Sequence, residues 1–325
     1  MRQRYEKITG RLLGLCLVIL AVVSCTYDYF EDENNFKIYI PQLKDGSVEN
    51  VLVAIHDAGG NHCYTRFIEG PFDPNTIGRD GILRFKLPWG RGYKVSAFAN
   101  VDKTCFDSGR SHQDSHVSEP LLGNAGQVYA PGPNFRVVLQ DDITSYPLDH
   151  PLAGIPDTVN LATDSVYKAS VLCEFHELPA AIARIDIQYK GIGTHMCYDG
   201  SYRRPTDGYV LSSYDVSAPG SVFKTGPDYI FPSTGTHYTD PDRYAREPMD
   251  LIVRFYGSDG SIMGEFSGFD TANPPTVTDS DGNIVPWDFY LDPRHQVKFV
   301  FKGFFVFKVE LTEWGDINQG EVTPM

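Results

Sequence analysis

The feature that most limits how this chain can fold is the alternation of apolar and polar residues in its best-patterned segments. The segment 183–190, ARIDIQYK, places Ile185, Ile187 and Tyr189 on one face and charged or polar side chains on the other. A period of two indicates a half-buried β-strand, and no helical crossover pattern supports a parallel sheet. Abundant Gly, Pro, Tyr and Phe also favour strands joined by turns. The pattern therefore predicts an all-β chain of antiparallel sheets.

Further strand-like segments recur along the chain, separated by turn residues. The sequence Ser-Asp-Gly-Ser at 258–261 suits a tight hairpin, and Lys-Gly at 302–303 separates the last two segments. A short helix is expected near 177–182. Alternate residues of the last segment are expected to share one apolar face: Phe305, Phe307, Val309 and Leu311. The predicted strands cover 36–40, 51–55, 82–87, 93–101, 135–140, 183–190, 251–256, 262–266, 296–301 and 304–312.

The first 25 residues have the pattern of an exported lipoprotein. Basic residues precede a short apolar run that ends at Ser24 and Cys25, and the run is shorter than the roughly 20 residues of a membrane-spanning helix. We interpret 1–24 as a signal peptide with a lipobox and Cys25 as the lipidated first residue of the mature chain. The acidic segment 25–35 is then a solvated tether. In a second interpretation, it is a sorting signal that directs the protein to the outer surface of the cell. The alternative is an uncleaved membrane anchor with an incidental cysteine.

Three prolines mark a boundary near the middle of the chain. Pro147, Pro151 and Pro156 remove backbone donors and discourage both a helix and a central strand. Without the leader, about 300 residues remain, which suits two domains of ordinary size. We therefore expect two antiparallel β-sandwiches on either side of a proline-rich linker. The predicted ranges are 36–145 for the N-terminal sandwich, 146–160 for the linker and 161–325 for the C-terminal sandwich.

The charge balance limits the partners of the chain. It has 42 Asp and Glu against 28 Lys and Arg, for a formal net charge of −14. Phosphate binding needs clustered basic residues, so nucleic acid is not expected as a partner. The remaining classes are a structural protein that assembles with other proteins, a carbohydrate-binding protein and an enzyme.

The cysteines agree with export to an oxidising compartment. Beyond the leader and Cys25, four remain, and an even number suits disulfides there. Four cysteines allow three connectivities, and a domain boundary between them favours Cys63–Cys105 and Cys173–Cys197. The alternative is four buried free thiols. Zinc is not expected because the sequence has no CxxC motif.

The motifs that suggest chemistry are incomplete. The segment 51–60, VLVAIHDAGG, is similar to the oxyanion loop of α/β-hydrolases, but the GxSxG nucleophile elbow of such enzymes is missing. We interpret 57–60 as a loop at a strand end, and we expect neither an enzyme nor a cofactor. Two further loops contain metal-binding residue types without a complete ligand set, so we expect a solvated loop and a hairpin turn. Their residues are His112, Asp114 and His116 in one loop and Asp279, Asp281 and Asn283 in the other.

Aromatic residues keep a second function open. Trp89, Trp287 and Trp314 could stack on sugars if they were exposed, as in a surface carbohydrate-binding lipoprotein. Packing in the core or at a sheet edge is the alternative for each of them. Two or three coplanar aromatic rings on one exposed face would favour the sugar-binding interpretation.

Three segments and the lipobox together resemble a known family. They are 81–101, GILRFKLPWGRGYKVSAFANV, 181–192, AIARIDIQYKGI, and 297–320, VKFVFKGFFVFKVELTEWGDINQG. In this order they resemble the fimbrillin-like superfamily of Bacteroidales surface lipoproteins, and within it the minor-fimbrium anchor family.

The resemblance implies two transthyretin-like β-sandwich domains and an outer-membrane lipoprotein that anchors or caps a fimbrial polymer. Its partners would be the fimbrial shaft subunit and, through the lipid on Cys25, the outer membrane. Completion of a sheet by a strand from a neighbouring subunit is one mode of contact. The C-terminal strand and the polar tail after it are the segments that we expect to take part.

Overall fold

The computed structural model describes most of the chain beyond the leader. The predicted signal peptide, Cys25 and nearly all of the tether lie outside the described residues. One short helix, α2 (Pro41–Asp45), occurs among the described residues, and none of their helices is long and apolar enough to cross a membrane. The described residues are 35–70, 72, 80–88, 92–123, 127–146, 150–152, 155–161, 168–205, 207–217, 222–233, 247–270, 272–278, 283–291 and 295–313.

A first lobe is built from two sheets that pack face to face. The larger sheet has the order β3-β2-β5-β9, and the smaller has the order β10-β1-β4 with β10 parallel to β1. Alternate apolar residues of both sheets meet in one core that includes Ile38, Val53, Leu83 and Val95. The strands are β1 (Phe36–Tyr39), β2 (Asn50–Asp57), β3 (His62–Glu69), β4 (Ile82–Phe85), β5 (Gly92–Ala99), β9 (Arg136–Thr144) and β10 (Asp157–Thr158).

A second lobe has the same plan. One sheet has the order β19-β18-β12-β15-β8, and the other has the order β16-β11-β22-β23 with β17 also paired to β11. The two sheets enclose the largest core, which includes Phe175, Ile187, Phe255 and Phe299. The strands are β8 (Val128–Tyr129), β11 (Ala169–His176), β12 (Ile182–Lys190), β15 (Tyr209–Asp215), β16 (Phe223–Lys224), β17 (Asp228–Ile230), β18 (Asp250–Gly257), β19 (Ile262–Phe266), β22 (His295–Lys302) and β23 (Phe305–Glu313).

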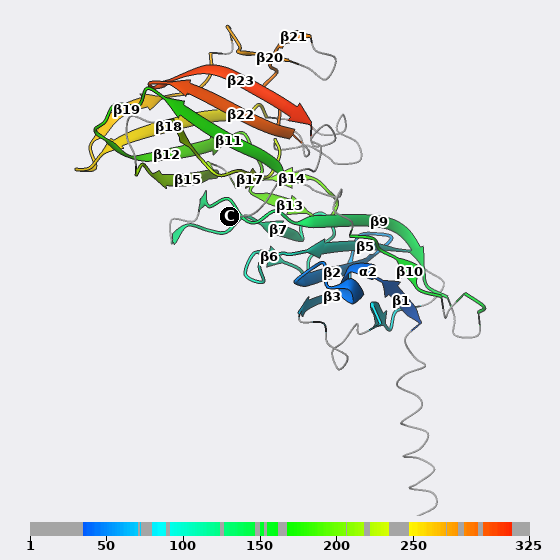
Figure 1. Cartoon of the computed structure of the whole chain (residues 1–325). Coiled ribbons are helices and arrows are strands. Elements are labelled where there is room, and N and C mark those ends of the chain that lie inside the picture. Colours follow the sequence, from blue (N-terminus) through cyan, green and yellow to red (C-terminus); the bar gives the residue numbers. More distant parts are fainter. Residues whose placement is uncertain are drawn as a thin grey trace, which may run out of the picture.

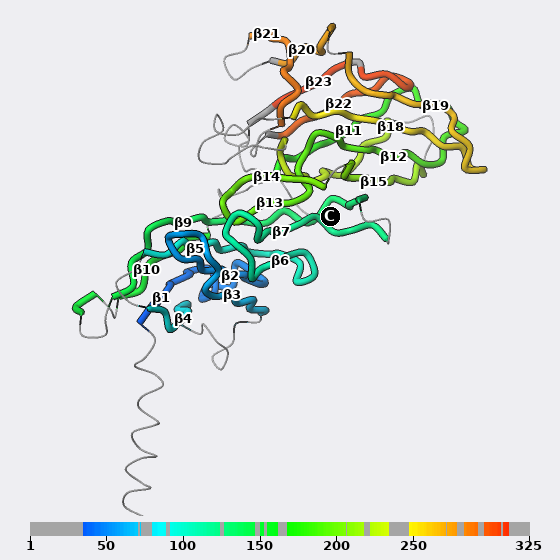
Figure 2. Tube along the Cα trace, turned by 180° about the vertical axis from the view of Figure 1, so that it is seen from behind, coloured from blue at the N-terminus to red at the C-terminus, as the bar shows by residue number. Residues whose placement is uncertain are grey.

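The two lobes are joined by strands that cross between the halves of the sequence (Figures 1 and 2). A junction sheet of order β14-β13-β7-β6 pairs segments from both halves, and β8 joins β15 of the second lobe. Phe98, Phe135, Tyr198 and Phe231 pack in a core beneath this sheet. The remaining strands are β6 (Phe106–Asp107), β7 (His116–Ser118), β13 (His195–Cys197), β14 (Tyr202–Arg203), β20 (Thr276–Thr278) and β21 (Ile284–Pro286).

The all-β prediction is confirmed, with differences in detail. Within the predicted linker 146–160, the strand β10 pairs with β1, and the buried Val159 belongs to the core of the first lobe. A strand pair satisfies the backbone that a free linker would expose to water. The helix expected at 177–182 is a turn, whereas α2 begins at Pro41 and ends at Asp45, where it is capped by Gly46 with φ of 71°. Three strand pairs are parallel: β1 with β10, β8 with β15 and β11 with β22.

The C-terminal hairpin was predicted correctly, but one part of its apolar face was not. A bulge between Val300 and Phe301 shifts the register, so that Val300 pairs with Lys308 and Phe301 pairs with Val306. The extra residue reverses the alternation in the first part of β23. Phe305 is therefore 71% exposed, whereas Val309 is buried in the core. The side chain of Phe307 lies outside the described part of the structure.

Candidate functional site at the junction of the lobes

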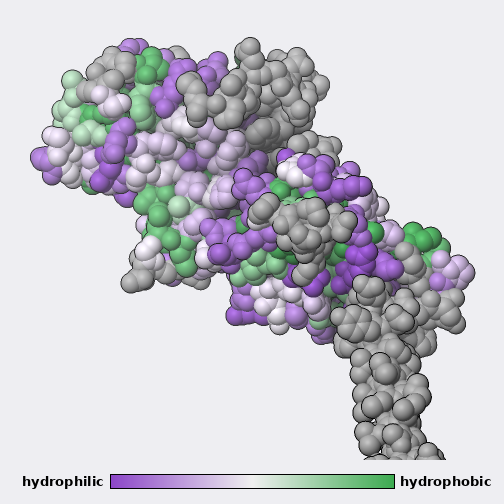
Figure 3. Space-filling view, turned by 60° about the horizontal axis from the view of Figure 1, so that its bottom comes forward, coloured by the Kyte–Doolittle hydropathy of each residue, from purple (hydrophilic) through white to green (hydrophobic). Residues whose placement is uncertain are grey.

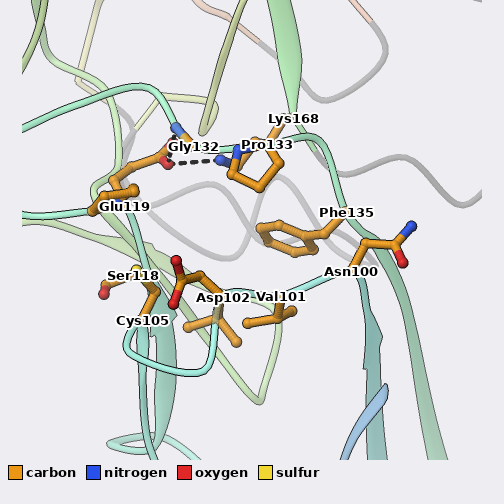
Figure 4. A pocket seen from close by; sticks show the side chains of 12 residues that line it. Asn100, Val101, Asp102, Cys105, Ser118, Glu119, Gly132, Pro133, Phe135 and Lys168 are labelled. Carbon is orange, nitrogen blue, oxygen red and sulfur yellow. Dashed lines mark hydrogen bonds and ion pairs between the residues drawn. The ribbon is translucent and has the colours of Figure 1, made fainter. Parts of the chain in front are cut away.

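A buried ion pair connects the two halves of the chain beside the junction sheet. Glu119 directly follows β7, and Lys168 directly precedes β11. Nζ of Lys168 lies 2.6 Å from Oε2 of Glu119, and the two side chains are 2% and 0% exposed. Charged side chains are almost never buried to this degree unless they are paired. The pair is shown in Figure 4.

The surroundings of the pair are tightly fitted. The backbone N–H of Gly132 donates a 2.8 Å hydrogen bond to Oε2 of Glu119. A Cβ atom on Gly132 would lie 2.7 Å from that oxygen, so the close approach requires glycine. The rings of Phe231 and Phe135 lie 4.8 and 5.3 Å from Nζ of Lys168, at cation–π distance.

Burial dominates the electrostatics of this pair. It raises the pKa of Glu119 and lowers the pKa of Lys168, and the attraction between the two charges opposes both shifts. Oε1 of Glu119 is buried and has no hydrogen bond of ordinary geometry. An interaction with the backbone of Phe231 still lowers the pKa of Glu119 and so favours the charged carboxylate. The adjoining cavity of about 10 Å³ has room for about one water molecule. The site is therefore a clamp between the lobes, and a substrate does not fit into it.

Histidines gather at the same junction. His56 of β2 is fully buried, and its ring centroid lies 5.0 Å from that of His112 and 5.7 Å from that of His62. Its ring also contacts Tyr198 at 5.9 Å, so residues from both halves of the chain meet here. Burial, together with the neighbouring His112 and His62, lowers the pKa of His56 from 6.5 to about 4. His56 consequently stays neutral at physiological pH.

The loop 111–116 was predicted to be solvated, and this is wrong for His112, which is 7% exposed. His112 packs on His56, whereas Asp114 accepts a hydrogen bond from Ser111 and His116 packs on His195. The three loop residues therefore point to separate neighbours. No group of three potential ligands suited to a metal ion occurs within the ranges that the structure describes. In the second loop, Asp279 and Asp281 lie outside those ranges.

A buried carboxylate links the two sheets of the second lobe. Asp228 of β17 accepts hydrogen bonds of 2.6 Å from the hydroxyls of Tyr189, Ser212 and Tyr214, which come from β12 and β15. Burial raises the pKa of Asp228 despite these three donors. Sequence reasoning missed this cluster, because Asp228 sits between Pro227 and an aromatic residue and looks like an ordinary turn carboxylate.

The four cysteines of the predicted disulfides lie in different parts of the fold. Cys63, Cys105, Cys173 and Cys197 are not joined to one another in the structure. Cys173 lies in the core of the second lobe, whereas Cys197 ends a strand of the junction sheet. Cys63 packs against the core of the first lobe, and Cys105 lines the cavity beside the Glu119–Lys168 pair. Members of each predicted pair thus belong to different packing environments.

The loop at 57–60 and the tryptophan Trp287 both have structural roles. The residues 57–60 form a turn between β2 and β3, as the loop interpretation required. Trp287 is 2% exposed and packs on Phe269, Phe289 and Phe299, so it belongs to the core. Trp89, Trp314 and the polar tail 316–325 lie outside the described residues.

Comparisons with known proteins found solved structures of similar fold but no relative by amino-acid sequence. No family model matches the chain, and no curated protein matches it significantly. The fimbrial anchor protein Mfa2 of Porphyromonas gingivalis is similar with 11% identity and a TM-score of 0.45, over 82% of this chain and 89% of that one. A candidate adhesin of Bacteroides ovatus is similar with 14% identity and a TM-score of 0.46, over 85% and 92%. A fimbrial assembly protein of Parabacteroides distasonis has 14% identity and a TM-score of 0.35, over 86% and 96%.

Proposed function

We propose that this chain is a non-enzymatic lipoprotein of the outer membrane that anchors or caps a fimbrial polymer. The observation that carries the proposal is the junction, where strands exchanged between the halves and the buried Glu119–Lys168 pair make the two lobes one continuous body. A component that holds a polymer must transmit force along its length, and packed, paired strands do so better than a free linker. The fimbrillin-like motifs in the sequence point to the same role.

Attachment to the membrane is assigned to the lipid on Cys25. The described chain begins at Asn35, so the lipobox precedes the first lobe by only the short acidic tether. Lipid chains supply the insertion energy, because the hydrophilic surface cannot. On the face seen in Figure 3, hydrophilic side chains cover most of both lobes and apolar side chains form separate patches.

Contact with the fimbrial shaft subunit is assigned to the side of the second lobe where β23 lies. In the described sheet β23 is an edge strand, and an edge offers backbone groups to a strand from another subunit. A cleft of about 530 Å³ runs beside it, between Val306 and Lys308 on one side and Phe269 and Pro275 on the other. Phe305 adds an exposed aromatic ring at the start of the strand.

Fractionation of cells that carry Cys25→Ala tests the proposed attachment. We expect the altered protein to fold and to leave the outer membrane, while fimbriae are shed into the medium. The matched control is Cys63→Ala, which removes a half-buried thiol of β3 and should leave both the protein and the fimbriae on the cell. Sedimentation of Cys25→Ala with outer membranes after a high-salt wash would contradict lipid attachment.

A further inference from the structure

We propose that the side chains of Lys168 and Glu119 condense to an amide, an isopeptide bond that joins the two lobes covalently. Nζ of Lys168 lies 2.6 Å from Oε2 of Glu119, and both side chains are buried. Two reactive groups held in contact within one fold react as if at very high concentration. The bond forms within a single chain and needs no separate enzyme to catalyse it.

The environment of the pair favours the amide over the two ions. A buried ion pair carries a desolvation cost that its mutual attraction often fails to repay, whereas an amide has no net charge. Burial raises the pKa of Glu119 and lowers the pKa of Lys168, which moves both groups toward the uncharged forms that react. The rings of Phe135 and Phe231 shield Nζ and keep bulk water away from the product.

The two carboxylate oxygens of Glu119 have different surroundings, which assigns their roles. Oε2 accepts the hydrogen bond of the Gly132 N–H, so it becomes the carbonyl oxygen of the amide. The negative charge that develops during the attack falls on Oε1, which is buried and is the oxygen that leaves.

The reaction is balanced without an oxidant, a reductant or a further reagent. A proton passes from the Lys168 ammonium to the Glu119 carboxylate along their hydrogen bond. The neutral Nζ attacks Cδ of Glu119, and one N–H proton passes to Oε1. The proton on Oε2 follows it as the bond between Cδ and Oε1 breaks, so Oε1 leaves as water and Oε2 becomes the amide carbonyl oxygen. One amide and one water molecule result. The adjoining cavity of about 10 Å³ has room for the one water molecule that is released.

Mass spectrometry of the full exported chain tests the bond under denaturing and reducing conditions. The masses of the wild type and of Lys168→Arg are compared for chains that carry the same lipid. After correction for the mass difference between lysine and arginine, the wild type should be lighter by the mass of one water molecule. Arginine keeps the positive charge but cannot form this amide. The matched control is Lys298→Arg, which alters a lysine 3.2 Å from Glu310 on an exposed sheet face and should retain the loss of water.

Tryptic peptides of the wild type provide the second measurement. We expect a branched peptide in which Lys168 is uncut and joined to Glu119. Absence of this peptide overturns the proposal, and so does a loss of water that persists in Lys168→Arg, because a succinimide at Asp259–Gly260 has the same mass change. Failure of the bond leaves the proposed fimbrial role standing, since that role rests on the exchanged strands of the junction and on the contact between Glu119 and Lys168, which persists as an ion pair without the amide.

Discussion

His195 of β13 lies edge-on to His116 of β7, with ring centroids 4.5 Å apart, so two imidazoles meet where the halves of the chain pair. Burial and the nearby His116 lower the pKa of His195 to about 4. His56 has the same value at the other histidine cluster of the junction, where Asp57 and the backbone of Arg110 oppose the shift only in part. The junction is therefore sensitive to acid.

Stability should fall as the pH decreases from about 6.5 to about 4. The unfolded chain takes up the proton of each histidine near pH 6.5 and the folded chain only near pH 4, so the unfolded state binds more protons between these values. This difference corresponds to a loss of about 3 kcal/mol each for His56 and His195. Urea unfolding at several pH values measures it.

The variant His195→Gln separates this effect from the titration of carboxylates. Its unfolding free energy should decrease less steeply than that of the wild type between pH 6.5 and pH 5. His150→Gln, which alters a histidine stacked on Tyr146 away from the junction, should follow the wild type. Equal slopes for His195→Gln and the wild type would contradict the assignment.

Asp228 should be a major source of stability in the second lobe. Asp228→Asn replaces one acceptor oxygen by an NH₂ group, which cannot accept a hydroxyl proton. Either Tyr214, or both Tyr189 and Ser212, would then lose their acceptor. A buried donor left unpaired costs about 1 to 3 kcal/mol. We expect the free energy of unfolding to fall by about that amount, and Tyr256→Phe at the half-buried Tyr256 to change it by less than about 0.5 kcal/mol.

Gly132 should not tolerate a methyl group. In Gly132→Ala the new Cβ would lie 2.7 Å from Oε2 of Glu119 and 3.1 Å from Nζ of Lys168, so the buried pair must separate. The amide proposed above then cannot form, and separating the buried charges that remain costs about 3 to 5 kcal/mol, which denaturant titration would detect. Gly226→Ala is the matched control, because a Cβ added there would have no atom within 4 Å, and it should be nearly neutral. A similar small effect in both variants would show that the pair is not tightly fitted.

Alkylation without reductant should label four cysteines in the unfolded mature chain. Before unfolding, the partly exposed Cys63 should react first, since the other three thiols are buried. Burial also raises the pKa of Cys105, Cys173 and Cys197, which lowers the fraction of reactive thiolate. Peptide mapping reads out the order. Thiols that react only after reduction would instead support the disulfides predicted from the sequence.

Phe305 should contribute to fimbrial capture rather than to folding. It is 71% exposed, so Phe305→Asp should leave the melting temperature nearly unchanged and reduce the retention of fimbriae on cells. Ile155→Asp is the control, since Ile155 is 62% exposed and lies two residues before β10 of the first lobe. Deletion of 316–325 is expected to weaken capture in the same way. Unchanged retention in both the Phe305 and the tail variants would contradict contact at this edge.

The amino-acid sequence by itself determined the best-patterned strands and two hairpins, whereas β3, β11 and β15 fall outside every predicted strand. Alternation along 183–190 and the Asp-Gly at 259–260 are local signals, because a strand's two faces and a turn's backbone angles depend on neighbouring residues. The structure places β12 at 182–190 and a turn at 258–260 with φ of 80° at Gly260. The composition likewise predicted the all-β class.

Only the tertiary structure decided which distant residues meet. Glu119 and Lys168 are 49 residues apart, and Asp228 and Tyr189 are 39 apart, so their contacts depend on how the lobes close. A lone Glu or Lys in a loop carries no sequence signal that separates a buried ion from a solvated one, since burial depends on distant residues such as Phe231. The bulge that exposes Phe305 arises in the same way, because register is set by pairing with β22 and not by the pattern of β23 alone.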